Sequence, residues 1–155
     1  MYDGYWTPAA GVRNPHTEGF TDRTRFLQKL LKAIYDERAA QQFYRVMYDR
    51  AMTMFQKRSI QHAWNDEIKH ERMLTHLYRS LTGSEAQVPI PGPPEIADFE
   101  RSVEQALEDE LAAAEHYREM YKMTTFREVR DLLLELTLDE MEHATRFTYI
   151  RAAMP

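Results

Sequence analysis

The sequence predicts an all-α protein, a four-helix bundle built from two copies of a helical hairpin. Three observations lead to this fold. Apolar residues recur at spacings of three and four along four long stretches, the sequence repeats itself once, and a proline-rich segment separates the two copies. With 155 residues, 43% of them hydrophobic, the chain is long enough for one domain with one core.

The predicted helices cover about residues 22–52, 57–81, 95–123 and 127–152. Thr21 or Asp22 can cap the first helix, because either side chain accepts hydrogen bonds from free helical amides. Residues 1–20 are rich in glycine, proline and aromatic residues and show no helical period. We therefore expect an extended N-terminal arm over 1–20 and the bundle over 21–155.

A shift of 73 positions carries the first half of the chain onto the second. The matched residues include Glu37 with Glu110, Tyr44 with Tyr117, Asp66 with Asp139, Glu67 with Glu140 and His70 with His143. In each half the two glutamates are 30 positions apart, with the turns expected near Met52 and Thr125. Residues equidistant from the turn of an antiparallel hairpin lie at the same height, so the glutamates of each half should be level.

Residues 82–95 form the proline-rich connector between the halves. Extended as polyproline II, such a segment spans roughly 43 Å at about 3.1 Å per residue. The second helix is shorter, about 37 Å at about 1.5 Å per residue. The connector can therefore cross the whole bundle and place the third helix parallel to the second, which is the one-crossover topology of ferritin-like bundles.

Composition excludes several classes of function. The net charge of -5 argues against nucleic-acid binding, and the absence of cysteine excludes disulfides, cysteine-held iron–sulfur clusters and thiolate zinc sites. The first residues lack the basic and apolar segments of a signal peptide, and no stretch approaches the roughly 18 apolar residues of a membrane span. We expect a cytoplasmic protein without a membrane partner.

Polar residues interrupt the apolar stripe of every predicted helix at its centre. They are Glu37, Glu67, His70, Glu110, Glu140 and His143. Four buried carboxylates in one layer repel one another and are costly unless cations compensate them. Two divalent cations match the four negative charges, and the imidazoles then serve as neutral ligands. The pattern predicts two metal ions about 3.5–4 Å apart, although a decayed site kept only for packing would leave the same residues.

Oxygen and imidazole donors without thiolate suit iron, manganese or zinc. Tyr44 and Tyr117 follow the ligand glutamates on the same stripes, so they either hydrogen-bond the ligands or simply fill the core. Gln41, whose repeat equivalent is Ala114, either bonds a ligand or fills space. The remaining histidines lie off the central stripes, which predicts surface positions for His16, His62, His76 and His116.

The motifs Glu37, Glu67-Ile68-Lys69-His70, Glu110 and Glu140-Met141-Glu142-His143 resemble the ferritin-like superfamily, and most of all its rubrerythrin-like branch, over about residues 22–152. The resemblance implies that the six ligands are also the catalytic residues. Glu67 and Glu140 would bridge two irons, while each of the other four would bind one.

The sequence differs from typical rubrerythrin sequences in three ways. Rubrerythrins usually carry a rubredoxin domain with four cysteines, and this chain has none. They carry an extra glutamate, tied to peroxide chemistry, at the place of Ala113. The six-ligand set without it also resembles bacterioferritin, but the 12 residues after His143 are too few for the fifth helix of ferritin cages, so we expect a small homo-oligomer.

The resemblance implies a di-iron oxidoreductase of peroxidase or ferroxidase type that reacts with O2 or H2O2. Because the chain has no cysteine and no Gly-rich dinucleotide motif, we expect a separate electron-transfer protein as reductant and no further cofactor. Three alternatives stay open. They are iron storage with ferroxidase activity, a di-manganese catalase, and a coat-associated structural protein.

Overall fold

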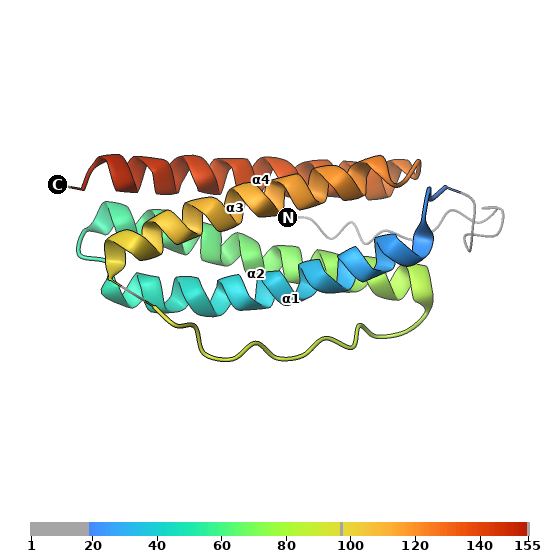
Figure 1. Cartoon of the computed structure of the whole chain (residues 1–155), viewed down its shortest axis with the longest axis horizontal. Helices are drawn as coiled ribbons and strands as arrows, with labels where there is room; N and C mark the ends of the chain where they lie inside the picture. The colour runs from blue at the N-terminus through green and yellow to red at the C-terminus, as the bar shows by residue number, and fades with distance from the viewer. Residues whose placement is uncertain (1–18, 97, 155) are drawn as a thin grey trace.

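The computed structural model describes residues 19–96 and 98–154, and this part of the chain folds into four long α-helices. They are α1 (Arg23–Arg50), α2 (Met54–Thr82), α3 (Phe99–Lys122) and α4 (Arg127–Ala152). Helix α1 packs mainly against α2, and α3 mainly against α4, so the bundle consists of two antiparallel hairpins (Figure 1). The all-α fold and its two-hairpin construction are confirmed.

Side-chain caps fix where three of the helices begin. The Asp22 carboxylate accepts from the Arg25 amide at 2.9 Å, and Asp98 caps α3 in the same way. Thr53 forms a capping box with Gln56, in which each side chain bonds the other residue's amide. Because Thr53 and Asp98 supply these caps, α2 begins earlier and α3 later than the apolar pattern predicts.

The connector between α2 and α3 runs beside α1 from one end of the bundle to the other (Figure 1). Two side chains of α1 hold its backbone. Arg38 Nη1 donates to the Val88 carbonyl at 3.1 Å, and Gln42 Nε2 donates to the Pro91 carbonyl at 3.2 Å. Helix α3 therefore starts at the end where α2 started, and the predicted crossover is confirmed.

The chain just before α1 packs against the turn between α3 and α4. Phe20 pairs with Thr124 in an isolated antiparallel bridge, and its ring lies 4.7 Å from that of Phe26. Gly19 has a φ of 102°, and a Cβ there would lie 2.6 Å from the Phe126 ring, so only glycine fits. The predicted arm otherwise falls on residues 1–18, which lie outside the described residues.

Two apolar clusters fill the bundle on either side of a polar layer. One includes Phe26, Leu74 and Leu133, and the other includes Ile60 and Phe147. The six polar stripe residues lie between them, so apolar side chains seal the layer along the bundle axis. None of the four helices combines the length and hydrophobicity that crossing a membrane requires.

Candidate metal centre

The polar layer is almost completely removed from solvent. The four glutamates expose between 1% and 3% of their surface, and both histidines expose 0%. One glutamate comes from each of α1 and α3, and a Glu-x-x-His pair comes from each of α2 and α4. The structure thus brings together all six residues that the sequence singles out, and it places them where an uncompensated charge is most costly.

The six residues form two overlapping groups that could each hold one metal ion. The first contains Glu37, Glu67, His70 and Glu140, and the second contains Glu67, Glu110, Glu140 and His143. Within each group the candidate ligand atoms all lie within 4.8 Å of one another. Glu67 and Glu140 belong to both groups, which is the position that a bridging carboxylate needs. Their metal ligation itself stays a prediction.

The Nδ1 atoms of the two histidines face the carboxylates. His70 Nδ1 lies 3.2 Å from Glu140 Oε1, and His143 Nδ1 lies 3.1 Å from Glu140 Oε2 and 3.3 Å from Glu67 Oε1. Despite these short distances, four buried atoms of the layer make no hydrogen bond: Glu37 Oε2, Glu67 Oε1, His70 Nδ1 and Glu140 Oε1. Buried polar atoms without partners are destabilising, and coordinated cations would satisfy them. The donor set therefore fits two transition-metal ions.

Two aspartates fix the orientation of the histidines. His70 Nε2 donates to Asp139 at 3.1 Å, and His143 Nε2 donates to Asp66 at 3.1 Å. These hydrogen bonds lower the pKa of both aspartates, which stay ionised and accept from an N–H. The proton therefore sits on Nε2, and Nδ1 is the nitrogen left to bind a metal. The repeat pairs Asp66 with Asp139, but the sequence pattern did not predict this role for either residue.

Two tyrosines hold the remaining carboxylates. The Tyr44 hydroxyl donates to Glu110 Oε1, and the Tyr117 hydroxyl donates to Glu37 Oε1. Burial, reinforced by the surrounding carboxylates, raises the pKa of both phenols well above 10, so both remain donors. Of the two roles considered for these tyrosines, the structure thus places them as hydrogen-bond donors to candidate ligands.

Protons compensate the charges of this layer in the metal-free protein. Burial raises the pKa of Glu67 far above its usual value and that of Glu110 to about 8. Burial alone would lower the pKa of His70, but its hydrogen bond with Asp139 and the nearby glutamate carboxylates raise that pKa far above 6.5. Asp66 and the nearby glutamates raise the pKa of His143 in the same way. Cations would displace these protons, so metal binding and proton release are coupled.

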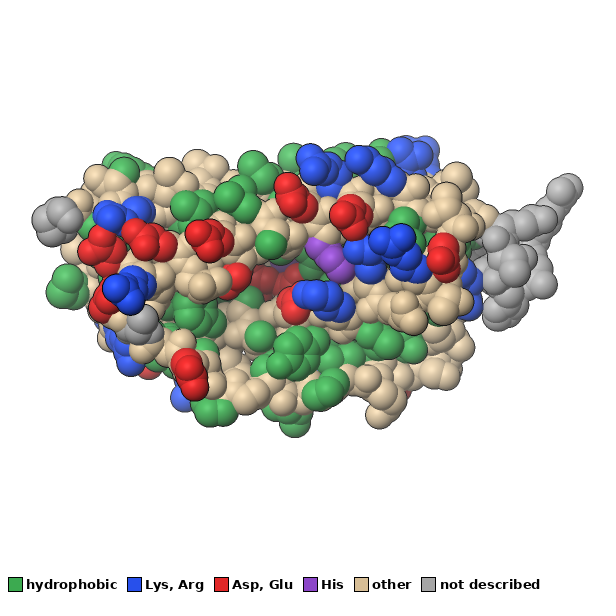
Figure 2. All heavy atoms as spheres, viewed as in Figure 1, with side chains coloured by type: hydrophobic (Ala, Val, Ile, Leu, Met, Phe, Trp, Pro, Cys, Tyr) green, Lys and Arg blue, Asp and Glu red, His purple; other side chains and the backbone are tan. Residues whose placement is uncertain are grey.

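A groove between α1 and α3 leads from the surface to the layer. Its volume is about 580 Å³, and its lining includes Glu37, Glu110 and the small side chains of Ala40 and Ala113. Figure 2 shows this face of the molecule, with acidic side chains in the floor of a recess. One water occupies about 30 Å³ of the liquid, so the groove has room for several small molecules beside the candidate ligands.

Other predicted positions differ from expectation. Gln41 does not bond a ligand carboxylate, because its amide donates to the Glu67 carbonyl at 3.3 Å and to Glu71 at 2.9 Å. His62, His76 and His116 are half-buried, not fully exposed, since positions beside a seam still face the grooves between helices. His116 Nε2 donates to the Lys29 carbonyl at 3.0 Å. His16 lies outside the described residues.

Comparison with known proteins identifies the family. Residues 28–151 match the sequence profile of the rubrerythrin family, which is most of the chain. The chain belongs to the rubrerythrin family. A relative in Bacillus subtilis (strain 168), the uncharacterized protein YhjR, is 27% identical over 137 residues, covering 87% of this chain and 92% of that protein.

Solved structures share the rubrerythrin-family fold. A hypothetical protein from Pyrococcus furiosus gives a TM-score of 0.75 at 24% identity, over 82% of this chain and 88% of that one. A conserved hypothetical protein from Mycobacterium tuberculosis gives 0.74 at 16% identity, over 85% and 94%. A two-domain protein from Anabaena variabilis with DJ-1/ThiJ/PfpI-like and ferritin-like domains gives 0.67 at 15% identity, over 86% of this chain and 38% of that one.

Proposed function

We propose that this rubrerythrin-family protein is a di-metal carboxylate oxidoreductase that binds two iron ions and reacts in its reduced form with H2O2 or O2. One observation carries the proposal. Four buried atoms of the Glu and His layer have no hydrogen-bond partner, although tyrosines and aspartates satisfy the atoms around them. Unsatisfied ligand atoms that converge in a buried layer are the arrangement that a bound cation requires.

The chain's own residues supply position and protons. When bound, two iron(II) ions supply the two electrons that, with two protons, reduce H2O2 to two molecules of water. Glu67 and Glu140 belong to both groups and would hold both ions, while Asp66 and Asp139 fix the orientation of the two histidines. Tyr44 and Tyr117 fix the remaining carboxylates and hold hydroxyl protons beside them.

The oxidant enters from one side of the molecule, and the electrons come from another protein. The groove between α1 and α3 admits O2 or H2O2 but keeps the layer itself shielded from bulk water. The chain has no cysteine to hold an electron-relay cluster, so we propose that a separate electron-transfer protein reduces the centre after each turnover. We propose a small homo-oligomer as the working assembly.

The test begins with anaerobic iron(II) loading, for which we expect two ions per chain. Stopped-flow mixing with H2O2 should then give one turnover that stops, and a reduced electron-transfer protein should restore cycling. Sustained peroxide loss without any donor would contradict this and favour a di-manganese catalase. Iron bound without reaction toward either oxidant would favour a structural role, and mineral growth in a cage of hundreds of kilodaltons would favour storage.

The same loading experiment separates the roles of the ligands. Glu67→Ala and Glu140→Ala should each disturb both metals, because both residues belong to both groups. His70→Ala and His143→Ala should weaken chiefly one metal each. Histidine variants that lose both metals, together with glutamate variants that lose none, would refute the assignment.

A further inference from the structure

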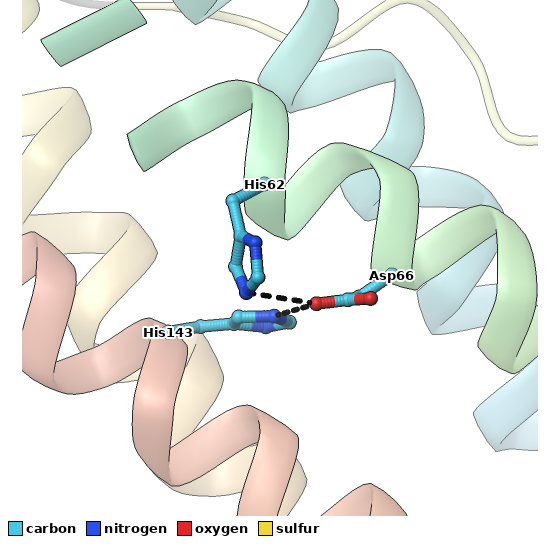
Figure 3. A group of neighbouring side chains, drawn as sticks. All are labelled: His62, Asp66 and His143. Atoms are coloured by element: carbon cyan, nitrogen blue, oxygen red, sulfur yellow. Dashed lines mark hydrogen bonds and ion pairs between the residues drawn. The ribbon is translucent and has the colours of Figure 1, made fainter. Parts of the chain in front are cut away.

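A second cluster of potential ligands lies on the α2–α4 side of the bundle, outside the buried layer. His62 and Asp66 are one turn apart on α2, and His62 Nε2 lies 3.2 Å from Asp66 Oδ2. Glu142 of α4 brings its Oε1 to 3.4 Å from the same nitrogen. Figure 3 shows His62 and His143 approaching Asp66 from different directions. None of these residues lines the groove between α1 and α3.

The internal repeat shows that this cluster is specific to one side of the molecule. The shift of 73 positions carries His62 onto Glu135 and Lys69 onto Glu142. On the other side Lys69 Nζ lies 2.6 Å from Glu135 and 3.6 Å from Asp139, so an ammonium neutralises that pair of carboxylates. On the His62 side, His62 stands in place of Glu135, and Glu142 stands in place of Lys69. That side therefore has an imidazole and two carboxylates but no ammonium group.

The described ion pairs of Asp66 involve histidines alone, namely His62 and His143. A carboxylate has about four lone-pair positions, so Asp66 can accept from His143 and bind a cation at once. His62 Nε2 is shielded from solvent yet makes no hydrogen bond. Nε2 therefore faces the two carboxylates without a hydrogen bond of its own.

One contact competes for the cluster. Arg146 donates to Glu142 Oε1 through Nε at 2.8 Å and through Nη2 at 2.5 Å. This pair lies one turn apart on α4, with 36% and 49% of the two side chains exposed. Exposed pairs of this kind add little to stability, so coordination of a divalent cation can displace Arg146 into solvent.

The ligand atoms within 4.8 Å of one another on this side belong to His62, Asp66 and His143. We propose that His62 Nε2 and the Asp66 carboxylate form an outer site for one divalent transition-metal ion, with Glu142 turning in from α4 and water completing its coordination. Imidazole together with carboxylate oxygen suits iron(II), cobalt(II) or zinc(II) and disfavours magnesium and calcium. The site is distinct from the buried layer, since neither His62 nor Glu142 belongs to either buried group. The His143 ring separates the two, with Nδ1 facing the layer and Nε2 facing Asp66.

Equilibrium dialysis against cobalt(II) tests this site by counting bound ions per chain. The parent protein should bind one ion more than His62→Ala, and the ions of the buried layer should remain in both. The matched control is Glu135→Ala, the repeat equivalent of His62, which should bind as many ions as the parent. Equal counts for the parent and His62→Ala, or an equal loss in Glu135→Ala, would overturn the proposal.

A gain-of-site variant provides an independent check. The double substitution Glu135→His with Lys69→Glu reproduces the His62 arrangement on the other side, so it should add one cobalt(II) ion per chain. A folded double variant that binds no more than the parent contradicts the proposal, because the same residues would then be insufficient. If neither the parent nor any variant binds ions in the buried layer, the proposed di-metal function is refuted. The outer site is judged separately, by the difference in bound ions between the parent and His62→Ala.

Discussion

Each histidine of the buried layer depends on one carboxylate from the other hairpin for its orientation. Removing the acceptor in Asp139→Ala should leave His70 Nε2 without its hydrogen bond and free the ring to turn. Because such outer partners typically contribute 10–100-fold to metal affinity, we expect a loss of about that size in cobalt(II) binding. Equilibrium dialysis measures it.

The control for Asp139→Ala is Asp131→Ala on the same helix. Asp131 is exposed and pairs only with neighbouring Arg127 in the described structure, so its loss should leave affinity unchanged. If Asp139→Ala binds cobalt(II) as tightly as the parent while remaining folded, Asp139 does not position His70.

That the six candidate ligands lie together could be predicted from the sequence, whereas their hydrogen-bond partners could not. Glu67 and His70 lie on an apolar stripe, and a position on a stripe follows from the helical period alone. Asp66 and Asp139 lie beside the stripes, where acidic residues usually face solvent. The repeat pairs these two aspartates with each other, but it does not indicate which residues they bond. Each reaches a histidine of the opposite hairpin, which depends on how α2 and α4 are rotated in the bundle.

At the level of helices, the apolar period and the repeat were enough to predict four helices, two turns and the crossover. The helix starts were less accurate, because Thr53 and Asp98 act through local hydrogen bonds that hydrophobicity does not register. The partial burial of His62 and His116 was not predicted, for a related reason. A stripe marks the centre of a helix interface, but the width of the neighbouring groove depends on side chains from two helices.

The groove between α1 and α3 leads to a prediction about access. Ala40→Leu adds bulk to its lining without touching a ligand, so the reaction of the reduced protein with H2O2 should slow severalfold while metal content stays the same. Stopped-flow kinetics on iron-loaded protein measures the effect. Ala153→Leu, an exposed position beyond α4, is the control and should react like the parent. An unchanged rate in Ala40→Leu would mean that the oxidant takes another route.

In the whole molecule, the hydrogen bonds around the layer link one hairpin to the other. Tyr44 of α1 bonds Glu110 of α3, and Tyr117 returns the same contact to Glu37. The histidine–aspartate pairs cross between α2 and α4 in the same reciprocal way. Neither hairpin alone completes a ligand group, so the site forms only when the two repeats dock. Metal binding should therefore stabilise the whole bundle and not one half.

This coupling predicts how stability depends on pH in the metal-free protein. The pKa of Glu110 is raised from 4.5 to about 8 in the folded state, so its contribution is present below pH 4.5 and is lost as pH rises toward 8. The pKa values of His70 and His143 are raised above 6.5, so their contributions are also lost with rising pH. All three groups act in the same direction, and the melting temperature should fall steadily from pH 5 to pH 8.

Circular dichroism melts of the metal-free protein across this pH range measure the effect. Glu110→Gln, which cannot ionise, should flatten the fall, and Glu115→Gln at an exposed position of α3 should not. The melting temperature of protein loaded with cobalt(II) should instead rise from pH 5 to pH 8. Protons compete with the cation for the same ligand atoms, and those atoms lose their protons as pH rises. A melting temperature of the metal-free protein that stays level or rises between pH 5 and pH 8 would mean that protons do not compensate the buried carboxylates.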